Sequence, residues 1–122
     1  MKKTIQTLLL LAACSSGGAI ACELPQAPTL PKGGEATMEQ MVAGQGTVKS
    51  YQNALATYRD CVSADIDSAK AAMKEASDAD EVKRLNAEHE SAVSAFNKAV
   101  ELEEKVAGQF NIEIRAFKAK NK

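Results

Sequence analysis

The chain has 122 residues, a length typical of a single domain, of which 45% are hydrophobic and 25% charged. Its seven glycines, absent tryptophan and formal net charge of −1 exclude a collagen-like repeat, a highly charged disordered chain and a strongly basic nucleic-acid binder. One histidine and three cysteines exclude most multi-ligand metal sites.

The beginning of the chain has the order of a secretory signal. Two lysines precede an apolar run over 5–13, which is too short to span a bilayer. Ala19 and Ala21 then give the A-x-A spacing that a signal peptidase reads. We therefore expect residues 1–21 to be a signal peptide, and the mature protein to begin at Cys22 and to be periplasmic or secreted.

The same segment contains a second processing signal. Leu11-Ala12-Ala13-Cys14 resembles the lipobox of bacterial lipoproteins, in which the cysteine is acylated and becomes the new N-terminus. Under this interpretation the protein is a membrane-anchored lipoprotein, and it contacts a membrane only through the lipid on Cys14. The residues leave both routes open.

By either route, Cys14 is removed or acylated, and Cys22 and Cys61 remain as unmodified cysteines. An exported chain enters an oxidising compartment, in which cysteines of small domains form disulfides. We therefore predict a Cys22–Cys61 disulfide. It would close a loop of about forty residues and contribute roughly 4 kcal/mol on a chain-entropy model.

Residues 22–36 are predicted to form an extended arm. Prolines recur at every third position, at Pro25, Pro28 and Pro31, and a polyproline II helix has three residues per turn. The prolines then form one apolar face, and the residues that precede each proline form a second. Such an arm can dock on a helical surface, and the alternative is a disordered linker.

The first helix is predicted over about 38–76. Thr37-Met38-Glu39-Gln40 has the S/T-x-x-E/Q form of a capping box, which marks a helix start. Apolar residues follow in steps of three, four and seven, which keeps one helix face apolar. Gly44 and Gly46 each weaken this helix by about 1 kcal/mol relative to alanine, so its stable part is expected to fray there or to begin near Thr47.

A turn and a second helix follow. Ser77-Asp78-Ala79-Asp80 is a polar cluster in which Ser77 is expected to cap the next helix. A comparable apolar stripe predicts a helix over about 79–118 that ends in a basic run, which suits the negative end of the helix dipole. The predicted fold is all-α: a long antiparallel two-helix hairpin over 37–122, with the extended N-terminal proline-containing arm.

The residues predict no catalytic, cofactor-binding or metal site. His89 has no second histidine or cysteine at helical spacing, as a metal site would require. Carboxylate pairs such as Asp78 with Asp80 are expected on a convex, solvated surface rather than in a cleft. We therefore expect a protein that is not an enzyme, uses no cofactor and does not bind nucleic acid.

Charge and aromatic residues predict a binding role. Residues 60–104 carry a net charge of −7, with 12 acidic and 5 basic side chains, and residues 105–122 carry +4, with 5 basic side chains and Glu113. The expected function is binding or scaffolding in the cell envelope, with an unknown envelope protein or a second copy as partner. The alternatives are a lipoprotein tether or a holdase-like periplasmic chaperone. The expected interface residues are Tyr51, Tyr58, Phe110 and Phe117.

Short motifs run through most of the chain after residue 21: the Cys22 and proline row, Gly33, V-K-S-Y over 48–51, Y-x-x-C over 58–61 and F-N-x-x-x-R-A-F-K over 110–118. With these motifs the chain resembles a group of small, exported, uncharacterised helical proteins of Gram-negative bacteria. The resemblance implies an envelope location and a disulfide, and it implies no activity.

Overall fold

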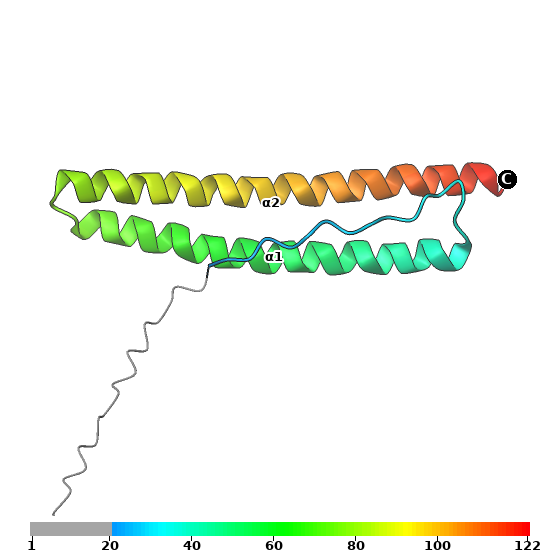
Figure 1. Ribbon diagram of the computed structural model, residues 1–122, viewed down its shortest axis with the longest axis horizontal. Coiled ribbons are helices and arrows are strands. Elements are labelled where there is room, and N and C mark those ends of the chain that lie inside the picture. The colour runs from blue at the N-terminus through cyan, green and yellow to red at the C-terminus, as the bar shows by residue number, and fades with distance from the viewer. Residues whose placement is uncertain (1–20) are drawn as a thin grey trace, which may run out of the picture.

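The computed structural model describes residues 21–122, which form two long helices and an arm. Helix α1 (Met38–Glu75) and helix α2 (Ala79–Lys120) lie antiparallel, side by side, and a short turn joins them (Figure 1). The arm that precedes α1 is extended and runs back along both helices toward the middle of the hairpin (Figure 1). The predicted all-α hairpin with an extended arm is confirmed.

Helix α1 begins where the capping box predicts. The backbone N–H of Gln40 donates to Thr37 Oγ1 over 3.2 Å, and the backbone N–H of Thr37 donates to Gln40 Oε1 over 2.8 Å. The helix then continues without interruption through Gly44 and Gly46. The expected fraying, or a start near Thr47, is therefore wrong, because the first turns are held by packing that outweighs the low helix propensity of glycine.

Gly44 provides part of that packing, because it is buried where the arm crosses α1. A Cβ atom at this position would lie 2.6 Å from Cγ of Pro31 and 3.1 Å from the ring of Phe110. The missing side chain therefore lets the arm approach the helix. Gly46 has no atom within 4 Å of the corresponding position and contributes only its conformational cost.

The two glycines should therefore respond in opposite directions to the same substitution. We expect Gly46→Ala to raise the free energy of unfolding by about 1 kcal/mol, because alanine favours a helix. Gly44→Ala gains the same propensity but forces the Pro31 ring away, so we expect it to lower the free energy of unfolding by about 1–2 kcal/mol. Urea titration of both variants measures the difference, and equal stabilisation by both would contradict the close crossing.

Helix α2 begins at Ala79, as predicted, but its N-cap is one residue away from the predicted one. Asp78, not Ser77, is the N-cap, and its Oδ1 accepts hydrogen bonds from the backbone N–H groups of Asp80 (2.9 Å) and Glu81 (3.0 Å). A carboxylate that satisfies two free N–H groups at the positive end of the helix dipole is favoured over a hydroxyl that satisfies one.

The main core lies in the half of the hairpin that the arm covers. Leu55 of α1 and Ala99 of α2 have no exposed surface, and Leu30 of the arm packs against this cluster. An ion pair between Arg59 and Glu103 joins the two helices beside it. The buried members of the cluster are Ala36, Met41, Val48, Tyr51, Leu55, Ala99, Val106 and Phe110.

The arm turns one of its two predicted apolar faces to the helices. Pro25, Pro28 and Pro31 are half-buried, as is Cys22, which belongs to the same every-third-residue row. In the second row, Leu24 is 43% exposed and Ala27 is also exposed, and Leu30 alone is half-buried. The proline row is thus the docking face of the arm.

The C-terminal end of the arm, at residues 33–36, is fixed to α2 near the C-terminus of the chain. The backbone N–H of Gly33 donates to Glu113 Oε2 over 2.7 Å, and Lys120 Nζ donates to the carbonyl oxygen of Ala36 over 3.4 Å. Gly33 is buried, and its Cα lies against the α2 backbone. Neither helix within residues 21–122 has a stretch long and apolar enough to cross a membrane.

Candidate functional site

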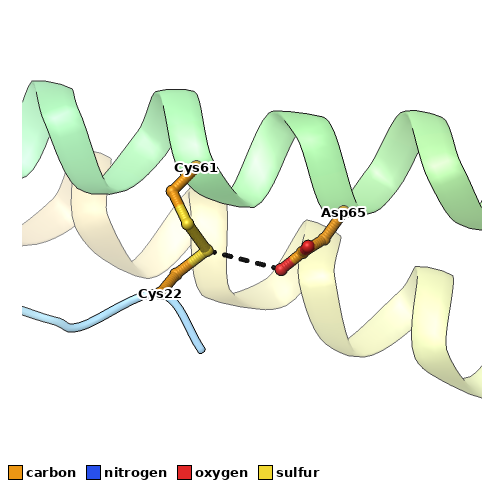
Figure 2. The surroundings of a disulfide bond; sticks show 3 residues. All are labelled: Cys22, Cys61 and Asp65. Atoms are coloured by element: carbon orange, nitrogen blue, oxygen red, sulfur yellow. Dashed lines mark hydrogen bonds between the residues drawn. A yellow bond between two sulfur atoms is a disulfide. The ribbon is translucent and has the colours of Figure 1, made fainter. Parts of the chain in front are cut away.

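The disulfide joins the N-terminal end of the arm to the middle of α1. Cys22 and Cys61 are bonded, with their Cα atoms 5.7 Å apart, which confirms the predicted pairing (Figure 2). One helical turn further on, Asp65 Oδ2 lies 3.4 Å from Cys22 Sγ (Figure 2). Since a bridged sulfur carries no hydrogen, this approach is a contact and not a hydrogen bond.

Two predictions concern the beginning of the chain. The predicted acylation site, Cys14, lies outside the described residues, as does the predicted signal peptide except for Ala21. Both remain predictions. Ala21 itself is exposed and lies at the end of the arm, next to the disulfide.

The four aromatic residues expected at an interface divide into two pairs. Tyr51 is 6% exposed and Phe110 is 7% exposed, and both pack in the intramolecular core beneath the arm. Tyr51 lines no surface hollow and is closed to a partner in this fold, so the interface prediction is wrong for this residue, whereas the small exposed part of Phe110 lines a hollow on the surface. Tyr58 and Phe117 are half-buried, and each lines a different hollow on the surface.

The burial of Tyr51 has an energetic consequence. Its hydroxyl oxygen is buried and has no hydrogen-bond partner among residues 21–122. A buried hydroxyl without a partner costs about 1–3 kcal/mol. We therefore expect Tyr51→Phe to leave the free energy of unfolding unchanged or to raise it by about 1 kcal/mol, as measured by urea titration. A loss of stability in Tyr51→Phe, with no loss in the control Tyr58→Phe, would contradict an unpaired hydroxyl.

A groove extends from the disulfide toward the turn of the hairpin, and we call it the tip groove. It lies between α1 and α2 and has a volume of about 820 Å³. The N-terminal end of the arm, at Ala21 and Cys22, bounds the groove on the side away from the turn. Its lining consists of Ala21 and Cys22 from the arm, Tyr58, Val62, Asp65, Ser68, Ala69 and Ala72 from α1, and Arg84, Leu85, Ala87, Glu88, Ser91, Ala92 and Ala95 from α2.

The lining of the tip groove is dominated by alanine and serine, with charged side chains beside them. Arg84 and Glu88 form an ion pair within α2, and both side chains are more than half exposed. Because solvent screens an exposed pair, it adds little to stability and can exchange for contacts with a ligand. An apolar floor with a few charged groups is typical of binding sites.

A second hollow lies at the open end of the hairpin, and we call it the open-end pocket. Its volume is about 270 Å³. Two large apolar side chains at its edge are unusually accessible, with Met38 64% exposed and Val42 60% exposed. The pocket is lined by Met38, Met41, Val42 and Gln45 of α1 and by Phe110, Ile114, Phe117 and Lys118 of α2.

Neither hollow could be located from the apolar stripes alone. Toward the turn, the stripe on α1 changes from Tyr51 and Leu55 to Ala69 and Ala72. That on α2 changes from Val106 to Ala95 and Ala92, and a large side chain returns at Leu85. Helix propensity is high throughout, so the change leaves the helices intact and removes only side-chain volume. The signal that marks the tip groove is thus the loss of bulk along a continuous stripe.

The described part of the chain contains no cluster of metal-ligating side chains. Among residues 21–122, no three histidine, cysteine, aspartate or glutamate side chains lie close enough together to hold a metal ion. His89 is half-buried on α2 and lies beside Glu90, Val93 and Lys98 on a surface away from the tip groove.

Comparison with known proteins gives no match: no family model, no curated protein and no solved structure matches this chain. Its function is therefore inferred from the disulfide, the docked arm, the tip groove and the open-end pocket.

Proposed function

We propose that this protein is an exported, non-enzymatic binding or scaffold protein of the cell envelope. The observation that carries the proposal is the Cys22–Cys61 disulfide, which holds the arm on the hairpin. Such bonds form and persist in oxidising compartments and are rare in the cytosol. A bond that fixes a recognition scaffold, rather than one that cycles in catalysis, suits a protein that works outside the cytosol.

The shape of the molecule supports binding as the mode of action. Helix α2 has 42 residues and is therefore about 60 Å long, so the hairpin is a long rod. The arm is fixed at Gly33 by Glu113 and at Cys22 by Cys61, which restricts its motion at both ends. The open-end pocket and the part of the tip groove beside Cys22 are thus presented by a fixed frame, and a fixed frame lowers the entropy lost on binding.

The intact mass of the native protein, recovered from envelope fractions with and without reductant, tests location and processing together. We expect a chain that begins at Cys22, carries no lipid and gains two hydrogens on reduction. A chain recovered from the cytosol with both thiols free would contradict the proposal. A chain that begins at an acylated Cys14 would replace it with a lipoprotein tether, which Cys14→Ser would release from the membrane fraction.

Crosslinking in intact cells tests the binding role itself. We expect a lysine-reactive crosslinker to join the protein to a specific envelope component, or to a second copy, in the native compartment. A protein that sediments as a strict monomer and forms no crosslinked product would contradict a binding or scaffold function.

The open-end pocket favours a second candidate, a holdase-like chaperone that shields unfolded exported chains. Met38 and Val42 are the exposed apolar side chains on its edge, and flexible methionines adapt to varied apolar surfaces. We expect such a chaperone to suppress aggregation of a reduced client, and the double variant Met38→Ser/Val42→Ser to lose that effect. Equal aggregation with and without the protein would remove this candidate.

A further inference from the structure

We propose that the tip groove binds an extended, proline-containing segment of another protein, in the way that the rest of the same interhelical channel binds the chain's own arm. The inference rests on the proposed binding function and specifies the chemistry of the partner. Its template is the one extended segment that the described residues already place on these two helices.

The first step is the chemistry of the docked arm. Helices α1 and α2 use their own backbone groups internally, so they offer an extended segment no ladder of hydrogen bonds. Within the described part, residues 22–31 form no backbone hydrogen bond with either helix. Proline has no N–H group, so its burial leaves no donor unsatisfied. A row of prolines is therefore a suitable docking face for a helical channel, and it is the row that the arm buries.

The second step is continuity. Ala21 and Cys22, at the end of the arm, line the beginning of the tip groove, and the same two helices form its walls. Beyond the end of the arm both helices continue toward the turn (Figure 1), and the tip groove is lined by residues of this stretch. Beyond the disulfide, from Val62 to Ala72, the groove follows 10 residues of α1, about 15 Å, which about five residues of a polyproline II helix span. Five residues hold two prolines at a spacing of three.

The third step is space. Where the arm crosses α1, the ring of Pro31 is accommodated because Gly44 has no side chain. In the tip groove, small side chains leave similar room on both walls, with Ala69 and Ala72 on α1 and Ala92 and Ala95 on α2. The groove can thus accept proline rings without moving bulky side chains.

A peptide with the arm's own sequence tests the proposal directly. The probe is fluorescein-labelled E-L-P-Q-A-P-T-L-P, residues 23–31, titrated with the oxidised protein as recovered from cells. We expect saturable one-to-one binding by fluorescence anisotropy. The same peptide with alanine in place of its three prolines should bind at least about tenfold more weakly, since it loses the ring contacts and the preformed extended shape.

A matched pair of variants locates the site. Ser91 lines the tip groove, and Ser94 lies on another surface of α2, beside His89; both are exposed serines. We expect Ser91→Phe to weaken peptide binding at least about tenfold by filling the groove, and Ser94→Phe to change it less than about twofold. Equal thermal melting of the two variants establishes that neither has lost the fold.

Four results would overturn the inference. No saturable binding by the wild type, or equal binding by Ser91→Phe and Ser94→Phe, removes the tip groove as the site. Binding that occurs only after reduction shows the peptide replacing the freed arm. If the free wild type sediments as a dimer and the Ser91→Phe variant sediments as a monomer, a second copy of the chain occupies the tip groove. Envelope crosslinks that persist when no peptide binds would leave the proposed function intact.

Discussion

Gly33→Ala is expected to lower the free energy of unfolding by about 3 kcal/mol and to detach the arm from the end of α2. A Cβ atom at Gly33 would lie 1.8 Å from the carbonyl oxygen of Glu113 and 2.8 Å from the backbone nitrogen of Phe117. Both are backbone atoms of a helix, so no side-chain rotation relieves the clash. The hydrogen bond from the Gly33 N–H group to the Glu113 carboxylate is also lost.

The neighbouring glycine provides a matched control for this substitution. A Cβ atom at Gly34 meets no atom within 4 Å. Gly34→Ala is therefore expected to be neutral or to stabilise by up to about 1 kcal/mol, since alanine restricts the unfolded chain. Urea titration of both variants measures the difference, and similar midpoints would show that the arm does not approach α2 as closely as described.

Removal of the disulfide is expected to have the second large effect, a loss of about 4 kcal/mol in the free energy of unfolding under oxidising conditions. The bond links residues that are 39 positions apart, so its absence restores considerable freedom to the unfolded chain. The double variant Cys22→Ser/Cys61→Ser is the appropriate one, because a single variant leaves a free thiol that can form other disulfides.

The reductant provides an internal control for that experiment. The wild type should fall to the stability of the double variant when reductant is added, and the double variant should not respond to it. Equal unfolding midpoints for wild type and double variant in the absence of reductant would refute a stabilising bond.

The hairpin and its disulfide could be predicted from the sequence because their signals are local or compositional. The start of α1 depends on Thr37 and Gln40, which lie three residues apart and satisfy each other's backbone groups. The pairing of Cys22 with Cys61 followed from the small number of cysteines. The period of three in the arm likewise predicted an extended docking face, although not which of its two apolar rows would be buried.

The features that were missed depend on contacts between residues far apart in the chain. From the sequence alone, Gly44 is expected to weaken the helix, and only its close contact with Pro31 explains why a glycine occupies this position. Tyr51 and Phe110 were expected at an interface, because the sequence predicts that the arm can dock on the hairpin but does not show which helix residues it covers. The tip groove arises from side-chain volume that is absent, to which a pattern of apolar positions is insensitive.

The core is unevenly distributed along the hairpin, and this distribution determines which part of the hairpin opens locally. The buried cluster around Leu55 and Ala99 lies under the arm, whereas Val62, Ala69 and Leu85, nearer the turn, are buried outside it. Amide hydrogens near the turn should therefore exchange with deuterium by local opening, faster than those beneath the arm, which exchange only when the cluster itself opens. The end that carries the tip groove is thus the more pliable end of the molecule, and an occupant there would slow its exchange.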